Sequence, residues 1–221
     1  MTYPNAADGV KKMFKAQLIE ILGTVFLALA AIFTIMLSSS EKAGAANDAD
    51  SFLAVMMIVS IVAFSGLMIV AAVMHLIGLV RAGRDERAFR TALFAVFINL
   101  IFIVTGMVFS GLKNGTVSSL MNLFSTIMDM IAFIFVIQGI RNLAIELGND
   151  KLDRMGDNIF KIILAVLVLE FIANIIVLIS GGHTSGIVAG VVYLIAAILS
   201  FVQYIIYLIF LARGVKMLTK S

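Results

Sequence analysis

The sequence predicts an all-α integral membrane protein in which six transmembrane helices form three repeated two-helix hairpins, with both termini in the cytoplasm. Composition is the first reason: the 221 residues are 62% hydrophobic and only 13% charged. A soluble domain has roughly 45–50% apolar and about 25% charged residues. The second reason is that six stretches are long enough for a bilayer, which needs about 20 apolar residues per helix. The third is a sequence pattern that recurs at alternate stretches.

The six predicted spans are joined by short connections and form one membrane domain, residues 1–221, which begins with a short cytoplasmic segment of residues 1–17. The only proline, Pro4, precedes the first span, so no proline kink is expected within a span. The absence of cysteine excludes disulfides, thiolate metal sites and cysteine nucleophiles. The predicted spans cover approximately residues 18–38, 52–80, 89–111, 117–141, 159–180 and 187–212.

An aromatic residue followed by a basic one marks the start of each hairpin, and an arginine marks its end. Around the opening pairs, the segments MFKAQL, AFRTAL and IFKIIL follow one another at spacings of 75 and 71 residues. Internal self-similarity of this kind is the signature of a repeated structural unit. We therefore expect three hairpins related by a common rotation, covering residues 10–81, 89–141 and 159–213. The opening pairs are Phe14-Lys15, Phe89-Arg90 and Phe160-Lys161, and the closing residues are Arg81, Arg141 and Arg213.

Basic residues lie almost entirely at one set of helix ends, and this asymmetry orients the chain. Of the 16 Lys and Arg residues, only Lys42 and Lys113 fall at the opposite ends. Cytoplasmic loops carry the excess of Lys and Arg in membrane proteins. Both termini and the loops at 81–88 and 142–158 are therefore predicted to be cytoplasmic, with the protein in the cell membrane. Because the charges border the spans, we do not expect nucleic acid as a partner.

Few polar side chains interrupt the spans, and those near the middle are the candidates for function. An ionisable residue at the bilayer centre costs about 2.5–3.5 kcal/mol, so Asp129 and Glu170 are expected to face the protein interior. No Lys or Arg lies at their depth, so each carboxyl is expected to be neutral, to share a proton or to hold a cation. Packing through hydrogen bonds is the alternative interpretation. The candidate proton or cation site consists of Asn99, Asp129, Glu170 and Asn174.

One polar residue recurs at the same level of the three odd-numbered spans. Thr24, Asn99 and Glu170 each lie ten residues after the Phe of the opening pair. In a bundle with three-fold pseudosymmetry these positions could converge on a central axis. Packing by hydrogen bonds is the favoured interpretation for Thr24 and Asn99. A functional role is favoured for Glu170, because a carboxyl at the bilayer midplane needs a partner.

The last span carries small and aromatic residues for which we expect structural roles. Gly186 and Gly190 are four residues apart, a spacing that permits close helix–helix packing. Tyr204 and Tyr207 lie toward the cytoplasmic end of the span. We expect both tyrosines to belong to the aromatic belt at the membrane interface.

No catalytic or cofactor-binding motif is present in the sequence, and the cytoplasmic loops are too short for a catalytic domain. We therefore expect no enzyme activity, no cofactor and no metal. Six spans in three two-helix repeats resemble the general plan of small bacterial acid-resistance membrane proteins, a resemblance of architecture alone. The sequence predicts a non-catalytic polytopic membrane protein, an assembly, scaffold or stress-related module that contacts the lipid bilayer and copies of itself or other membrane proteins. The alternative is a small proton- or cation-coupled transporter or channel that uses Asp129 and Glu170.

Overall fold

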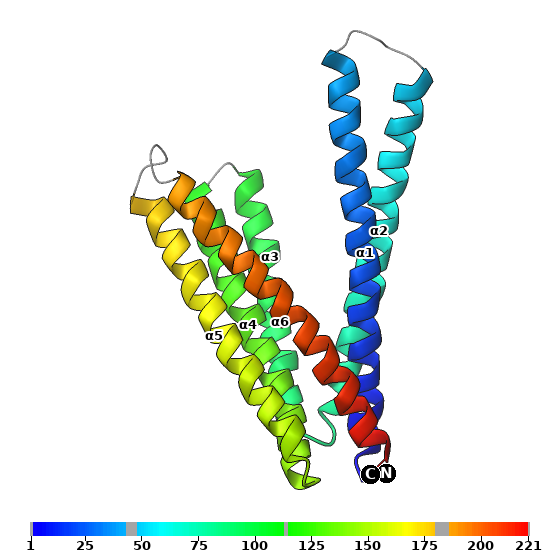
Figure 1. Cartoon of the computed structure of the whole chain (residues 1–221), viewed down its shortest axis with the longest axis vertical. Coiled ribbons are helices and arrows are strands. Elements are labelled where there is room, and N and C mark those ends of the chain that lie inside the picture. The colour runs from blue at the N-terminus through cyan, green and yellow to red at the C-terminus, as the bar shows by residue number, and fades with distance from the viewer. Residues whose placement is uncertain (1, 43–47, 113–114, 180–185, 221) are drawn as a thin grey trace. The chain divides into compact units, whose positions relative to one another are not determined.

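The part of the chain that the structure describes consists of α-helices and short connections. The structure is a computed structural model and describes residues 2–42, 48–112, 115–179 and 186–220 (Figure 1). The helices are α1 (Pro4–Lys42), α2 (Asp48–Ala82), α3 (Arg87–Gly111), α4 (Gly115–Glu146), α5 (Asp150–Ile179) and α6 (Gly186–Lys220). Over these residues, every helix except α5 contains a segment long and apolar enough to cross a membrane. The prediction of an all-helical chain with apolar helices of membrane length is confirmed at this level.

The chain divides into two compact units. The first, Lys11–Gly78, holds most of α1 and α2, and we call it the hairpin unit. The second comprises Met1–Val10 and Leu79–Ser221, and we call it the four-helix unit because it contains α3 to α6.

Within the hairpin unit, α1 and α2 run antiparallel and pack through small and flexible side chains. The hydroxyl of Thr34 donates to Met57 Sδ at 3.3 Å. Gly23 is buried, and a Cβ there would lie 3.5 Å from Met68 Sδ and 3.6 Å from a Phe64 ring carbon. Apolar side chains cover the outer surface, and Ile69 is 66% exposed. A surface of this kind is suited to lipid rather than to water.

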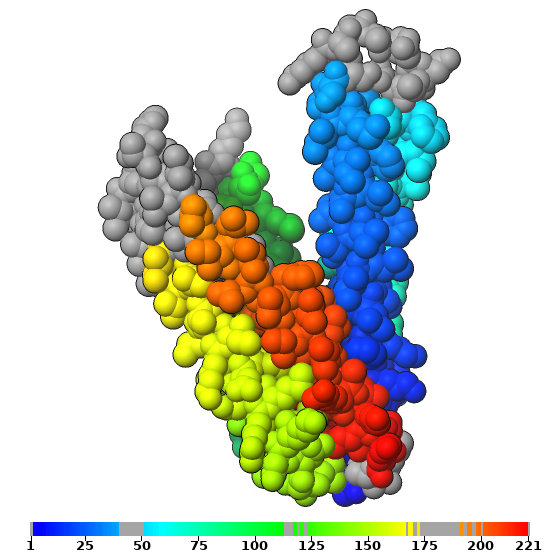
Figure 2. Space-filling model, viewed as in Figure 1, coloured from blue at the N-terminus to red at the C-terminus, as the bar shows by residue number. Residues whose placement is uncertain are grey.

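Within the four-helix unit, α3 packs on α4 and α5 packs on α6, while α4 also contacts α5 and α6. Figure 2 shows α5 in yellow and α6 in orange to red, lying side by side. Phe89 of α3 is fully buried, and its ring lies against Gly139 of α4. A Cβ at position 139 would come within 2.9 Å of that ring. Glycine is therefore required here for the close approach of the two helices.

A tight turn joins α4 to α5, and Gly148 makes it possible. Gly148 has a positive φ of 67°, a conformation that costs other residues roughly 1–2 kcal/mol. The amide of Asn149 donates to Ala144 O at 2.7 Å, and the amide of Gly148 donates to Ile145 O at 3.0 Å. These two bonds form a Schellman motif. Asn149 Oδ1 then accepts from the Leu152 amide at 3.2 Å and caps α5.

Most of the predicted loop over residues 142–158 is helical, and its predicted cytoplasmic location stays a prediction. The helices α4 and α5 run through most of this segment, where charged residues form ion pairs between the two helices or within α5. Arg141 Nε lies 2.8 Å from Asp153 Oδ1, and Lys161 Nζ lies 2.7 Å from Asp157 Oδ2. The hydrogen bond from Lys161 lowers the pKa of Asp157. A Cβ at Gly156 would lie 2.5 Å from Arg141 Cγ, so this glycine makes room for the arginine stem.

The start of α1 belongs to the four-helix unit and is held by the connection between α2 and α3. Asp85 Oδ2 accepts from the Ala6 amide at 2.7 Å, and Asp85 Oδ1 accepts from Asn5 Nδ2 at 2.8 Å. The carboxylate therefore satisfies amide groups at the helix start. Tyr3 donates to Glu146, and Arg81 pairs with Asp8. Residues 4–17 are thus helical and continuous with the predicted first span.

The aromatic residues of the repeated pattern occupy different environments. Phe89 is fully buried, Phe14 is half-buried and Phe160 is 38% exposed. The sequence repeat therefore does not correspond to one repeated packing role for these rings. The three-hairpin repeat remains a prediction.

Candidate functional site

The structure brings together Asn99 and Asp129, two of the predicted site residues, across the contact between α3 and α4. Ser125 Oγ donates to Asn99 Oδ1 at 2.6 Å. Asn99 Nδ2 donates to Asp129 Oδ1 at the longer distance of 3.5 Å. Ser125 and Asp129 are four residues apart on α4 and so share one helix face. The amide of Asn99 thus binds the serine with its oxygen and the carboxylate with its nitrogen.

Contacts on both sides of this polar group hold α3 against α4. On one side, the rings of Phe102 and Phe124 stack with centroids 5.4 Å apart. On the other side, Phe89 fills the space above Gly139. The register of the two helices is therefore set by apolar contacts, and it places Asn99 opposite the Ser125–Asp129 turn.

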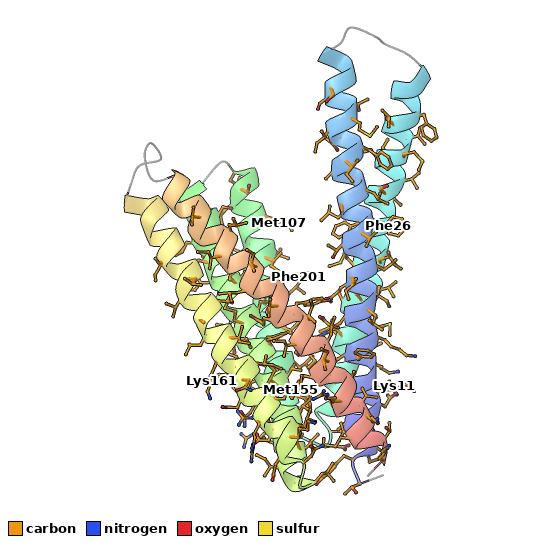
Figure 3. The ribbon with its side chains drawn as sticks, in the orientation of Figure 1. Lys11, Phe26, Met107, Met155, Lys161 and Phe201 are labelled. Atoms are coloured by element: carbon orange, nitrogen blue, oxygen red, sulfur yellow. The ribbon has the colours of Figure 1, made fainter. Side chains whose placement is uncertain are left out.

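Asp129 also lines a partly open cavity of about 200 Å³ formed by residues of α4, α5 and α6. A water molecule takes up about 30 Å³ of liquid, so the cavity has room for several waters if polar partners are present. Asp129, Gln203 and Tyr204 supply those polar partners. Figure 3 labels Phe201 on the same helix as Gln203; Phe201 is 66% exposed, whereas Gln203 is half-buried. The remaining lining residues are Met130, Phe133, Ile163 and Val166.

The arrangement is suited to a proton or a monovalent cation. Calcium and magnesium bind several oxygen ligands, often with more than one carboxylate. Among the side chains that the structure describes, no three His, Asp or Glu come together as a metal site would need. Asp129 provides one carboxylate, and the neighbouring polar groups of Asn99 and Gln203 are amides. One negative charge beside amide oxygens and water can bind a proton or balance one positive charge.

Several predicted site residues are not found in this group. The side chains of Glu170 and Asn174 lie outside the residues whose side chains the structure describes, and the surroundings of Gly186 and Gly190 do as well. Thr24 lies in the hairpin unit, where its hydroxyl donates to Glu20 O at 2.9 Å. Such a bond to the preceding helical turn is the common arrangement for a threonine within an apolar helix.

The prediction that Tyr207 belongs to an interfacial aromatic belt is wrong. Tyr207 is fully buried, and its ring lies 4.1 Å from that of Phe133, centroid to centroid. Tyr204 lines the Asp129 cavity. The sequence does indicate that Tyr207 faces inward. Gln203 and Tyr207 are one turn apart on α6, and a Gln within a membrane span favours the side that faces other helices. Two polar groups on one face of α6 indicate that this face packs against other helices, more strongly than they indicate a place in the interfacial aromatic belt.

The chain matches no family model, no curated protein and no solved structure. Its function is therefore inferred from the residues of the Asp129 cavity and from the apolar helices around them.

Proposed function

We propose that this chain is a six-span protein of the cell membrane, with both termini in the cytoplasm, in which Asp129 binds and releases a proton or a monovalent cation. The observation that carries the proposal is the position of Asp129. Its carboxylate lines a cavity shared by three helices and also accepts a hydrogen bond from Asn99 of a fourth. A carboxyl within an apolar helix is costly unless it has such surroundings, and ionisable residues of this kind mark ion and proton pathways.

The distribution of basic residues supports the orientation of the proposed spans. Fourteen of the 16 Lys and Arg residues flank one set of helix ends, since only Lys42 and Lys113 do not. The start of α1 and the end of α6 belong to the same unit, where a Cβ at Gly214 would lie 3.7 Å from Val10. Their proximity is consistent with termini on one side of the membrane, and the positive-inside rule makes that side cytoplasmic.

The helical register of α5 supports a role for Glu170 and Asn174 near the same cavity. Ile163 and Val166 of α5 line it. Positions 170 and 174 follow Val166 at intervals of four residues, so they fall on the same helix face. We propose that Glu170 continues the pathway from Asp129 toward the opposite end of the bundle.

A second candidate function is favoured by the short bond between Ser125 and Asn99. At 2.6 Å it is a well-formed interhelical hydrogen bond, and polar residues in membrane helices often serve helix packing. On this reading the protein is a non-catalytic assembly or scaffold module. Its exposed apolar faces would contact lipid, a second copy or another membrane protein.

A comparison of two variants separates these functions. The protein is reconstituted in liposomes, and proton and sodium or potassium flux is measured together with thermal stability in detergent. If Asp129 exchanges an ion, Asp129→Asn abolishes the flux and leaves the stability near that of the wild type. Ser125→Ala should show the reverse: it keeps the flux and loses about 0.6–2 kcal/mol, the range for an intramembrane hydrogen bond.

The scaffold function predicts a different pair of results. The wild type would then catalyse no flux above that of empty liposomes for any of these ions, and Asp129→Asn would alter stability alone. That outcome would exclude the proposed ion exchange.

A further inference from the structure

A second cavity, of about 390 Å³, lies where the start of α5 meets the end of α6. Its volume falls within the range of small-molecule sites, roughly 300–1,000 Å³. Four of the seven lining residues are basic and none is acidic. We call it the basic groove; its lining residues are Asn149, Lys151, Leu152, Arg213, Lys216, Met217 and Lys220.

The lysines of the basic groove have no acidic partner among the residues that the structure describes. Arg213 Nη1 lies 3.6 Å from Met155 Sδ, a weak contact that places the guanidinium beside α5. Figure 3 labels Met155 on α5, the helix that packs against α6. Arg81 and Arg141, which close the other two predicted hairpins, pair with aspartates instead. The groove therefore concentrates positive charge that the described protein does not neutralise.

An apolar stripe on α6 leads to the basic groove. Val202, Ile205 and Ile209 precede Arg213 at helical intervals that place all four on one side of the helix. These three side chains are 42%, 42% and 44% exposed. A ligand that fits both features has an anionic group at one end and an extended apolar part.

We propose that the basic groove binds the phosphate of an anionic phospholipid, whose acyl chains lie along the exposed stripe of α6. Phosphate suits the site because a guanidinium can bind two of its oxygens at once while ammonium groups supply further charge. Basic pockets between membrane helices at the cytoplasmic side are known to hold anionic headgroups. This proposal rests on the membrane location and orientation proposed above. It does not depend on ion exchange at Asp129.

The test uses the full chain, purified in an uncharged detergent and stripped of lipid. Native mass spectrometry measures the binding of phosphatidylglycerol, of phosphatidylcholine with the same acyl chains, and of inorganic phosphate. The variant Lys216→Gln/Lys220→Gln removes two charges from the groove. The matched control, Lys11→Gln/Lys15→Gln, removes two exposed lysines that also lie near a predicted span end but outside the groove.

We expect the wild type to bind phosphatidylglycerol in preference to phosphatidylcholine. The groove variant should bind phosphatidylglycerol about 30-fold more weakly, because each basic residue near the surface contributes roughly fivefold. The control variant should keep the affinity of the wild type. Because Lys216 and Lys220 are exposed, the groove variant should retain the helical content of the wild type by circular dichroism. If it does not, the single variant Lys220→Gln should still weaken binding about fivefold.

Three results would overturn the proposal. Equal binding of the two lipids would show that charge is not recognised. An equal loss in the control variant would show attraction by general surface charge. Displacement of phosphatidylglycerol by equimolar inorganic phosphate would show a site for a soluble anion. Asp129→Asn should bind phosphatidylglycerol like the wild type, so failure of the ion-exchange proposal is distinguishable from failure of this one.

Discussion

Ser125 and Asp129 lie one turn apart on α4 and face the same asparagine, yet their bonds to it differ. The bond from Ser125 to Asn99 is 2.6 Å long, whereas that from Asn99 to Asp129 is 3.5 Å long. A short bond between neutral groups holds two helices together and has no further consequence. The longer bond joins Asn99 to a carboxylate that also lines a cavity, where we propose that an ion or water reaches it. This difference is the reason for assigning packing to Ser125 and ion exchange to Asp129.

Substitutions of Glu170 test its proposed place in the ion pathway. Glu170→Gln keeps the shape and the hydrogen bonds of the side chain but cannot exchange a proton. We expect this variant to fold normally and to lose ion flux in liposomes. Glu170→Leu should in addition lower the stability in detergent by roughly 0.6–2 kcal/mol. A Gln variant that matches the wild type in both flux and thermal unfolding would remove Glu170 from the pathway.

Hydropathy predicted the apolar parts of the helices, but it did not predict how far the helices extend beyond those parts. The predicted fourth and fifth spans stop at 141 and begin at 159, but α4 ends at Glu146 and α5 begins at Asp150. Hydropathy places the end of a span where charged residues begin. Here those charges pair across the turn, Arg141 with Asp153 among them, so the helices continue. Such pairing depends on the register of two helices, which the hydropathy pattern does not contain.

The turn between α4 and α5 should be sensitive to replacement of Gly148. Gly148→Ala should destabilise the protein by about 1 kcal/mol, because alanine at a positive φ is strained. Thermal unfolding in detergent measures the change. Gly111→Ala is the matched control, since nothing lies within 4 Å of a Cβ there and its φ is not positive. An equal loss in both variants would contradict the role given to the Schellman motif.

For the molecule as a whole, the sequence predicted helix number and apolar character, and it predicted two residues that meet in the candidate site. Asn99 and Asp129 were identified because polar residues are rare in apolar helices. The cavity was not predicted, because it depends on how α5 and α6 pack against α4. Tyr207 was misplaced for the same reason: composition gives its depth in a membrane, while its burial against Phe133 is a property of the packed helices.

Cysteine labelling can test the proposed membrane topology of the whole chain. The chain has no cysteine, so single cysteines report on one position each. Cysteines at Asn47, Asn114 and His183, which lie outside the described residues, should react with an impermeant thiol reagent added outside intact cells. Cysteines at the exposed positions Arg84 and Arg154 should not. Labelling at Arg84 from outside would reverse the orientation given by the positive-inside rule.

Ion exchange at Asp129 requires that water reach its cavity inside the membrane, and the reactivity of one cysteine tests this requirement. Gln203 lines the cavity, whereas the adjacent Val202 is 42% exposed on the apolar stripe. The reaction of a thiol with a small charged methanethiosulfonate requires ionisation of the thiol, which is strongly disfavoured in lipid. Each variant is reconstituted in liposomes and its rate of modification is measured. We expect that Gln203→Cys reacts and Val202→Cys does not. Equal rates at the two positions, or no reaction at Gln203→Cys, would contradict it.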